Sequence, residues 1–361
     1  MNHSHTPRHT IDACIARISP VDPALKQTAM AHIDNLTKPR GSLGRLEELA
    51  ARLFALGLGR TPLAADPARI FTIAADHGVA AEGVSASPVI VTRQQVHNFI
   101  NGGGGISVLA RANGIGHMVV DAGVAGEEFP DHPALVRNKI ASGTANMAEG
   151  PAMTMDECLD ALALGIRLAE KAHAEGVRCL GTGEMGIGNT TPSTALFSVL
   201  YGLDPAAIVG PGAGLSPEGM RHKVSIIHKA LAANADAVNS KDPVRILAAL
   251  GGLEIAALAG LVLGAASFRL PVVIDGFIST AACAMALAIA PDAREYCFFS
   301  HASAEPGHAA VMERLGQRPL VDLEFRLGEG TGAVFGVVLL RSAAAMFNDM
   351  ATFSGAGVAA P

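Results

Sequence analysis

The chain has 361 residues, of which 50% are hydrophobic, and its formal net charge is -6. This length and apolar content allow a large core, most simply one α/β domain with an accessory helical part. The negative charge and the lack of Lys/Arg runs argue against nucleic acid and anionic lipid as partners, so small molecules are the expected ligands.

Both ends of the chain have helical patterns. The first ten residues, MNHSHTPRHT, are polar and lack the apolar centre of a secretory signal, so residues 1–10 are expected to be a disordered tail. LGRLEELAARLFALG near the start and GVVLLRSAAAMFNDMATF near the end show helical spacing. We predict that 11–60 and 337–354 pack together as a small helical domain, beside a large α/β domain over 61–336.

Strand-like runs recur along the middle of the chain, and each is followed by a helix-like segment. They are IFTIAADHG, MVVDAG, VRCLGTGEMG, PVVIDG and REYCFFSHAS. This alternation predicts a parallel sheet with crossover helices. Asp76, Asp121 and Asp275 end three of these runs, each with a glycine just after it. One such Asp could simply cap a helix, but three together favour a ligand site at the carboxyl edge of the sheet.

The cysteines and the most apolar run both favour a soluble cytoplasmic protein. The five cysteines are scattered without a CxxC pair, which is typical of buried, reduced thiols in the cytosol. The run IAALAGLVLGAASF falls short of the ~20 residues that span a bilayer. We expect it to form a buried helix.

The segment GTGEMGIGNTTPSTAL predicts a cradle for a phosphate between a strand and a helix. Glycines would let backbone N–H groups approach the anion, and polar side chains would add donors at the helix start. The residues are Gly183, Gly186, Gly188, Asn189, Thr190 and Thr191. Lys223 could supply the compensating positive charge. A tight structural turn would explain the same glycines, and Glu184 and Met185 interrupt the dinucleotide-binding pattern.

Two further segments carry candidate site residues. Ser87, Gln94 and Gln95 in EGVSASPVIVTRQQ could hydrogen-bond a polar heterocycle. Glu329 in DLEFRLGEGTGAVFG stands between two glycines where a helical pattern begins. From the residues alone, this carboxylate is either a helix-start acid or a catalytic group.

Other motifs are weaker or missing. The four successive glycines of NFINGGGGISVLARANG indicate either a close backbone approach or a flexible connector. His77 and His301 lie at predicted strand ends, and structural hydrogen bonding is the plainer interpretation for both. No Ser/His/Asp order, HExxH motif or spaced Cys/His cluster supports covalent hydrolysis or zinc chemistry.

Six ordered motifs carry a specific resemblance: LTKPRGSLGRLE, ADHGVAAEGVSASPVIVTRQQVHNF, GEMGIGNTTPSTA, VVIDGFISTAACAMA, SHASAEPGH and RLGEGTGA. From about Ile18 to Phe353 the chain resembles the nicotinate-nucleotide:dimethylbenzimidazole phosphoribosyltransferase family of cobalamin biosynthesis. The resemblance implies a Rossmann-like parallel sheet with helices on both faces, a small domain built from the chain ends, and a homodimer. It implies no metal or redox cofactor.

The resemblance also implies an activity and roles for the main polar residues. Phosphoribosyl would pass from nicotinate mononucleotide to dimethylbenzimidazole, releasing nicotinate and giving α-ribazole 5'-phosphate. Glu329 matches the family's general base, which takes the benzimidazole proton as the new bond forms. Glu184 would lie near the ribose and the reacting centre. The glycine-rich loop would hold the phosphate, with Lys223 as its charge partner.

The acceptor pocket and the remaining strand ends follow from the same resemblance. Ser87 and Gln95 match positions that line the benzimidazole pocket, and Asp275 and Ser303 match strand-end positions beside the nucleotide. Three alternatives stay open at this point. They are transfer to another lower-ligand base such as adenine or a phenol, a dinucleotide-dependent oxidoreductase, and a non-catalytic nucleotide-binding protein.

Overall fold

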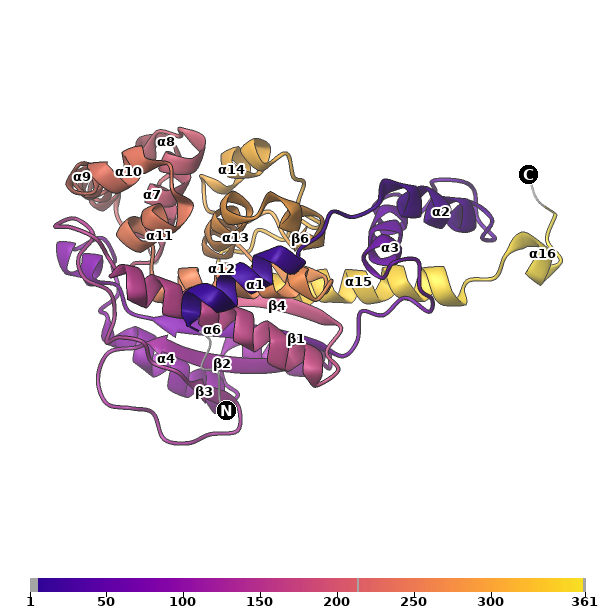
Figure 1. Ribbon diagram of the computed structural model, residues 1–361, viewed down its shortest axis with the longest axis horizontal. Coiled ribbons are helices and arrows are strands. Elements are labelled where there is room, and N and C mark those ends of the chain that lie inside the picture. The colour runs from indigo at the N-terminus through magenta and orange to yellow at the C-terminus, as the bar shows by residue number, and fades with distance from the viewer. Residues whose placement is uncertain (1–5, 213, 360–361) are drawn as a thin grey trace.

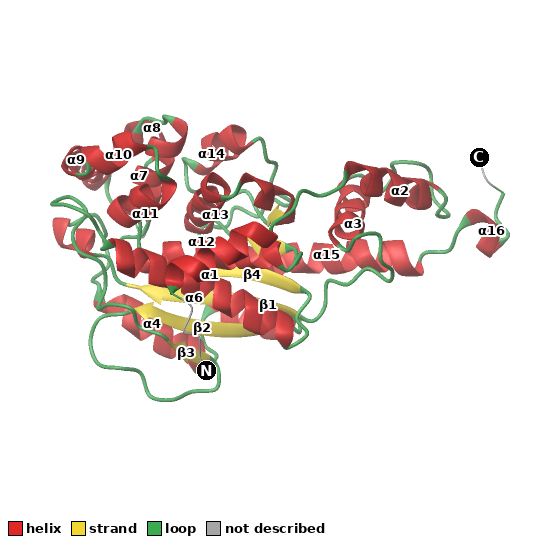
Figure 2. Cartoon of the chain, viewed as in Figure 1, coloured by secondary structure: helices red, strands yellow, loops and turns green. Residues whose placement is uncertain are grey.

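The computed structural model describes residues 6–212 and 214–359, and its centre is a six-stranded parallel sheet (Figures 1 and 2). The strands are β1 (Ala68–Ala75), β2 (Gly116–Gly123), β3 (Leu135–Arg137), β4 (Cys179–Met185), β5 (Val272–Ile274) and β6 (Cys297–Phe299). Their order, β3-β2-β1-β4-β5-β6, is that of a Rossmann fold, and it reverses between β1 and β4. The predicted parallel sheet is confirmed. The short strand β3 was not predicted, because three residues are too few to show alternation.

Helices cover both faces of the sheet, as predicted. One face carries α6 (Met155–Ala174) and α12 (Leu253–Ser267), and the other carries α5 (Gly105–Ala112) and α15 (Thr331–Asp349). The other helices are α1 (Pro7–Arg17), α2 (Pro23–Asp34), α3 (Arg45–Leu56), α4 (Ile90–Ile100), α7 (Thr190–Tyr201), α8 (Pro205–Ile208), α9 (Pro217–Ala233), α10 (Ala235–Ser240), α11 (Pro243–Leu250), α13 (Phe277–Ile289), α14 (His308–Leu315) and α16 (Phe353–Ala356), with the short 3₁₀ helices η1 (Gly78–Glu82) and η2 (Pro291–Tyr296).

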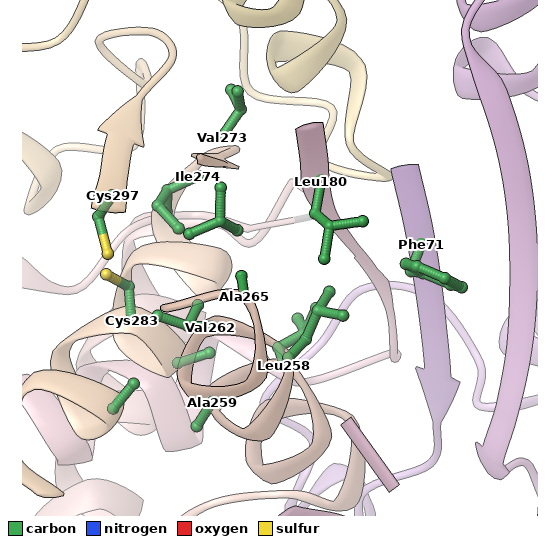
Figure 3. Packing of buried hydrophobic residues seen from close by; sticks show 14 of the residues in the cluster. Phe71, Leu180, Leu258, Ala259, Val262, Ala265, Val273, Ile274, Cys283 and Cys297 are labelled. Atoms are coloured by element: carbon green, nitrogen blue, oxygen red, sulfur yellow. The ribbon is translucent and has the colours of Figure 1, made fainter. Parts of the chain in front are cut away.

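The core is densest where α12 lies between the sheet and α6. Every residue of α12 is buried, as expected for a helix that is apolar on all sides. Figure 3 shows Leu258 of α12 facing Leu180 of the sheet, with Val262 on the side of Cys283. On its other side α12 meets α6 backbone to backbone, because a Cβ atom added at Gly260 would lie 1.9 Å from the Leu162 carbonyl oxygen. The predicted buried helix is therefore confirmed.

Helices α2 and α3 meet the C-terminal end of α15 and the segment after it, away from the carboxyl edge of the sheet. Helix α3 packs on α2 and on α15, which runs from the sheet to this helical part (Figure 1). The backbone N–H of Thr37 donates to Ala351 at 2.9 Å, and that of Phe353 donates to Asn35 at 3.1 Å. The boundary predicted at 336/337 falls inside the continuous helix α15. The division into two domains stays a prediction.

The N-terminal segment differs from its prediction in two respects. Residues 1–5 of the expected disordered tail lie outside the described residues, but Pro7–Thr10 form the first turn of α1. The Thr6 side chain caps this helix and Pro7 occupies its first turn, a pattern that favours a helix start. Helix α1 also packs on α6 and α12 rather than with α2 and α3. Its buried face, Ile11 and Cys14, completes the core of the sheet domain.

Two observations bear on solubility and redox state. Helix α15 has the length and composition of a membrane span, with a mean hydropathy of 1.4, but 61% of that stretch is buried inside the protein. The core helix of a globular protein has the same composition, and the contacts of α15 with β4, β5 and α3 are of that kind. All five cysteines are free and buried, as predicted.

Candidate active site

A cavity of about 330 Å³ opens at the carboxyl edge of the sheet, close to the point where the strand order reverses. Open α/β sheets bind their ligands at this place. Its walls come from 84–95 with the start of α4, from 184–190 at the junction of β4 and α7, from Gly212, from the turns after β5 and β6, and from 326–329 before α15. The cavity therefore gathers segments that are more than 200 residues apart in the sequence.

Most of the predicted site residues line this cavity. They are Ser87, Gln95, Glu184, Gly186, Gly188, Asn189, Thr190, Ser303 and Glu329. Gly183, Thr191, Lys223 and Asp275 are buried in or behind its walls instead, and Gln94 is exposed outside it. The structure thus gathers most of the predicted residues on the surface of one cavity. The buried ones among the rest support its walls from behind.

Glu329 occupies a constrained backbone position. Its φ is 64°, in the left-handed region, and its neighbours Gly328 and Gly330 also have positive φ. Non-glycine residues in that region carry backbone strain, which is often found at functional sites. The side chain is buried, and its Oε2 accepts the backbone N–H of Ile106 at 3.2 Å at the start of α5. Burial raises the pKa of Glu329, while the N–H groups of Ile106 and Gly105 act in the opposite direction.

Glycines make room for this carboxylate and its backbone. A Cβ atom added at Gly183 would lie 2.2 Å from the Glu329 carbonyl oxygen, so the strand must lack a side chain there. A Cβ atom at Gly105 would lie 2.8 Å from Leu327 Cδ2 and 3.1 Å from Glu329 Oε2. Gly183 therefore makes room for the loop that carries Glu329, and it does not line the cavity. Of the two interpretations of the four-glycine segment, close backbone approach is correct for Gly105.

Glu184 is a second buried carboxyl group in the cavity. Asn189 Nδ2 donates to its Oε2 at 2.5 Å. Burial raises the pKa of Glu184 to about 8, and the charges of Asp275 and Glu254 add to that effect. A Cβ atom at Gly328 would lie 2.3 Å from Glu184 Oε1, so the loop before α15 lies directly against this side chain. Near neutral pH, Glu184 is mainly protonated and can donate a hydrogen bond.

The turn between β4 and α7 has a buried lysine behind it. Lys223 of α9 is fully buried, and its Nζ donates to Thr190 Oγ1 at 2.6 Å. Burial lowers the pKa of Lys223 to about 8, whereas the charge of Glu305 raises it. Thr190 lines the cavity, so Lys223 reaches the wall through this hydroxyl. Thr191 is wholly buried without a side-chain partner and does not reach the cavity, which departs from its predicted role.

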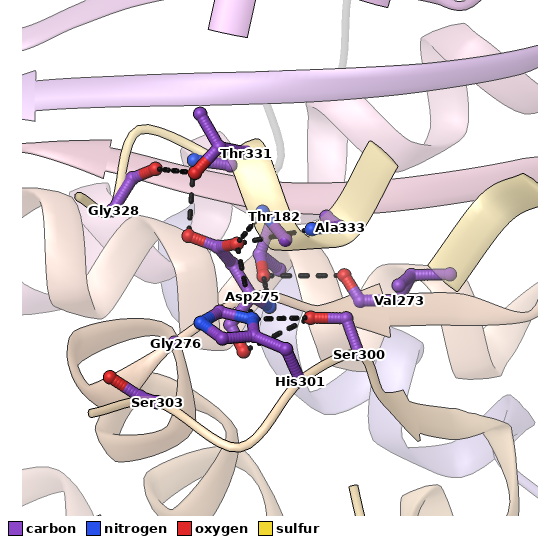
Figure 4. Close-up of polar contacts among 12 residues, drawn as sticks. Thr182, Val273, Asp275, Gly276, Ser300, His301, Ser303, Gly328, Thr331 and Ala333 are labelled. Atoms are coloured by element: carbon purple, nitrogen blue, oxygen red, sulfur yellow. Dashed lines mark hydrogen bonds and ion pairs between the residues drawn. The ribbon is translucent and has the colours of Figure 1, made fainter. Parts of the chain in front are cut away.

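Asp275 holds the start of α15 rather than lining the cavity (Figure 4). Its Oδ1 accepts the N–H groups of Gly332 at 2.7 Å and Ala333 at 3.1 Å, and its Oδ2 accepts that of Gly330 at 3.1 Å. Burial raises the pKa of Asp275 to about 7 against these hydrogen bonds, which lower it. The carboxylate therefore caps the helix that begins just after Glu329.

The other two strand-end aspartates hold the loop after β2 and cap no helix. Asp76 Oδ2 accepts the N–H of Ala125 and Asp121 Oδ1 accepts that of Val124, each at 2.8 Å. Neither lines the cavity. None of the three aspartates caps the helix that follows its own strand, and only Asp275 caps a helix at all, although the edge of the sheet that they indicated is the one that carries the cavity.

The two strand-end histidines differ in position. His77 Nε2 lies 2.6 Å from Glu254 Oε1 in a buried pair behind the cavity wall. A Cβ atom at Gly186 would lie 3.1 Å from His77 Nε2, so this pair supports the turn after β4. His301 lines the cavity, and its Nδ1 is hydrogen-bonded to Ser300 Oγ at 3.1 Å.

Sequence reasoning missed two charged residues in the walls. Glu305 and Arg326 line the cavity, and Glu305 Oε2 has no hydrogen-bond partner among the described residues. Burial raises the pKa of Glu305, and the charges of Lys223 and Arg326 lower it. Both residues lie in or next to recognised motifs, SHASAEPGH and RLGEGTGA, and that position was the available signal. In the described part of the chain, no group of three or more His, Cys, Asp or Glu side chains could hold a metal ion.

The chain is similar to known phosphoribosyltransferases along almost its whole length. A family model described as phosphoribosyltransferase matches residues 18–358. Nicotinate-nucleotide–dimethylbenzimidazole phosphoribosyltransferase of Nitratidesulfovibrio vulgaris (strain DP4) is 61% identical over 350 residues, or 97% of this chain and 98% of the relative. The protein of the same name from Chlorobaculum tepidum is 50% identical over 344 residues, covering 95% of this chain and 96% of the relative.

A solved structure gives the same result for the fold. The crystal structure of nicotinate-nucleotide–dimethylbenzimidazole phosphoribosyltransferase from Thermus thermophilus superposes with a TM-score of 0.86 at 46% identity. The match covers 94% of this chain and 100% of that chain. The likeness therefore confirms the parallel sheet with helices as the fold.

Proposed function

This chain belongs to the nicotinate-nucleotide–dimethylbenzimidazole phosphoribosyltransferase family, and from that premise we infer that its cavity transfers phosphoribosyl with Glu329 as the general base. The donor is nicotinate mononucleotide and the acceptor is dimethylbenzimidazole. The products are nicotinate and α-ribazole 5'-phosphate, which forms the lower ligand of cobalamin. The observation that carries the residue assignment is the buried Glu329 carboxylate, aimed into the same cavity as the glycine-rich turn after β4.

The proposed step needs one base and no acid. One benzimidazole nitrogen attacks C1' of the ribose while the bond from C1' to the nicotinate nitrogen breaks on the opposite face, which inverts the anomeric centre. The bonding electrons neutralise the positive pyridinium ring, so the leaving group needs no proton. The N–H of the attacking ring passes its proton to Glu329. Burial, which raises the pKa of Glu329, makes its carboxylate a stronger base than an exposed one.

The donor nucleotide is proposed to bind at the wall formed by 184–190. The start of α7 and the glycines at 186 and 188 offer backbone N–H groups to the phosphate, and Thr190 adds a hydroxyl polarised by Lys223. The protonated Glu184 is proposed to donate to a ribose oxygen beside the reacting centre. Ser303, across the cavity from this turn, is proposed as a further nucleotide contact.

The acceptor is proposed to lie between α4 and the loop before α15. Ser87 and Gln95 supply polar groups there, and Val84, Val91 and Leu327 supply apolar surface for a flat ring. Gln95 Oε1 accepts from Asn98 Nδ2 at 3.0 Å, which leaves its amide N–H groups for a ligand. Transfer to adenine or a phenol at the same pocket is the alternative, since pocket shape and not the base Glu329 selects the acceptor.

We further propose that the chain works as a homodimer in the cytoplasm. Leu327 is 61% exposed and Ile90 is 54% exposed, and both belong to segments that form the mouth of the cavity. Exposed apolar residues of this kind favour coverage by a second copy. The five unbridged cysteines suit a reducing compartment. Sedimentation velocity tests the assembly, and a mass of one chain at micromolar concentration would contradict it.

The decisive experiment incubates the purified protein with nicotinate mononucleotide and an equimolar panel of dimethylbenzimidazole, adenine and a phenol. Mass spectrometry then identifies the ribotide that forms. We expect α-ribazole 5'-phosphate and stoichiometric nicotinate. A dominant product from another base would change the acceptor and leave the base role intact, whereas absence of any ribotide would reject the transfer itself.

A further inference from the structure

The backbone of Glu329 is anchored from beneath by the sheet. Thr72, in the middle of β1, is fully buried, and its Oγ1 donates to the Glu329 carbonyl oxygen at 2.7 Å. In the sheet register Thr72 is paired with Gly183 of β4, the residue whose missing side chain leaves room for this carbonyl. The peptide of Glu329 thus lies against Gly183, and the Thr72 hydroxyl holds its carbonyl oxygen.

A histidine on the next strand holds that hydroxyl in turn. His117 of β2 places Nε2 2.9 Å from Thr72 Oγ1. It is paired in register with Ile70, so it lies on the same face of the sheet as Thr72. Because Thr72 has one hydroxyl proton and the carbonyl can only accept, His117 must be the donor at Nε2. Burial lowers the pKa of His117 to about 4, so the ring is neutral and carries its proton on Nε2.

The remaining anchors of this loop act on its other atoms. Asp275 holds the N–H of Gly330, and the Thr331 side chain donates to the Gly328 carbonyl at 2.9 Å. The N–H of Ile106 holds the carboxylate. The stretch 322–328 before Glu329 is irregular. Thr72 is therefore the side chain that fixes the carbonyl of the strained residue, and neither Thr72 nor His117 lines the cavity.

We propose that Thr72 and His117 are positioning residues for the transfer reaction, holding the Glu329 peptide in its left-handed conformation so that the carboxylate meets the acceptor N–H. This inference rests on the proposed role of Glu329 as the base. The two residues touch no substrate; they act through the backbone of Glu329. Their loss should reduce the chemical step and leave donor binding nearly unchanged, because neither residue lines the cavity.

The test uses near-isosteric pairs of variants. Thr72→Val keeps the branched shape that suits a strand but removes the hydroxyl, and Thr72→Ser keeps the hydroxyl. His117→Phe keeps an aromatic ring beside Phe99, while His117→Gln restores an N–H donor near the position of Nε2. Ser267→Ala is the matched control, because it removes one buried hydroxyl that donates to a helix carbonyl at 2.9 Å, away from the cavity.

Single-turnover rates and KM for nicotinate mononucleotide are measured on each folded variant. Small displacements of a catalytic group can cost up to about 100-fold, so we expect Thr72→Val to lower the rate by roughly 10- to 100-fold with KM within about twofold. Thr72→Ser and His117→Gln should recover most of that rate. The double variant of Thr72→Val with His117→Phe should be no slower than Thr72→Val alone, because the histidine acts through the threonine.

Three results would overturn the inference in distinguishable ways. If Glu329→Gln keeps wild-type turnover, the base assignment fails and the positioning role fails with it. If Glu329→Gln is inactive but Thr72→Val is as fast as Ser267→Ala, only the positioning role is rejected. A rise in KM with an unchanged rate would make Thr72 part of donor binding instead. Should Thr72→Val not fold, the contrast between His117→Phe and His117→Gln decides the question by the same criteria.

Discussion

The two walls of the cavity are built in different ways. The donor wall, 184–190 with Lys223 behind it, is the end of a strand and the start of a helix, and its side chains are tied by the bonds from Asn189 to Glu184 and from Lys223 to Thr190. The acceptor wall, Ser87 and Gln95 with 326–329, is mainly irregular chain and contains the strained Glu329. In the proposed function, regular elements hold the charged donor and the strained loop carries the base.

The same comparison applies to the two glutamates. Glu184 on the donor wall is deeply buried among other carboxyl groups, so its pKa rises to about 8 and its neutral form predominates. The pKa of Glu329 on the acceptor wall is also raised by burial, but its carboxylate faces two N–H groups at the start of α5, which favour the ionised form. These surroundings suit the two identical side chains to their proposed roles as a hydrogen-bond donor and a base.

The largest effect is expected from Glu329→Gln. The amide keeps the shape of the side chain but cannot take the proton, so turnover should fall about 100- to 10,000-fold while donor binding persists. Single-turnover product formation and a donor titration measure the two quantities. Retention of more than half of the wild-type rate would remove Glu329 as the base and erase the contrast between the two walls.

The next effect belongs to the donor wall. Lys223→Met fills similar volume but removes the charge and the hydrogen bond that holds the Thr190 hydroxyl at the proposed phosphate site. A charge-assisted hydrogen bond contributes roughly 1.5–3 kcal/mol, so KM for nicotinate mononucleotide should rise by up to about 10- to 100-fold. The phosphate-free riboside, measured in parallel, should change little because it lacks the group that Lys223 serves. Equal losses with both donors would separate Lys223 from phosphate binding.

A smaller effect is expected for acceptor choice. Ser87→Phe fills the space proposed for a flat bicyclic ring, and Gln95→Met removes a polar group at constant length. The ratio of dimethylbenzimidazole to adenine products should shift by about 1–3 kcal/mol in competition, with donor KM unchanged. If both folded variants leave the product ratio as it is, the acceptor lies elsewhere.

The smallest effect at neutral pH is expected for Glu184→Gln, because an amide also donates a hydrogen bond. The rate at pH 7 should stay within about tenfold. Wild-type Glu184 ionises as the pH rises through about 8, so the wild-type rate with the riboside should fall there and that of the variant should not. The riboside is used because Lys223, with a pKa of about 8, is proposed to act on the phosphate and would titrate in the same range. Identical alkaline profiles would show that the proton on Glu184 has no role.

The sequence by itself determined every strand except β3, the edge of the sheet that carries the site and many of the polar residues that line the cavity. Runs such as IFTIAADHG and PVVIDG are short-range patterns of apolar residues ending in Asp and Gly, and backbone preferences act over the same short range. The ordered motifs added the activity and the candidate base Glu329. The three-residue β3 and the helix at Pro7–Thr10 were not predicted, because the first is too short to show a pattern and the second begins in a polar stretch.

Only the tertiary structure decided what each polar residue does. Asp275 is a helix cap because α15 returns to the end of β5, and Lys223 reaches Thr190 because α9 packs on α7. The bond from Thr72 to Glu329 joins residues 257 apart in sequence, and no local pattern contains it. The physical reason is that burial, hydrogen-bond partners and pKa depend on groups brought together by folding, whereas a sequence pattern records only the preferences of neighbouring residues.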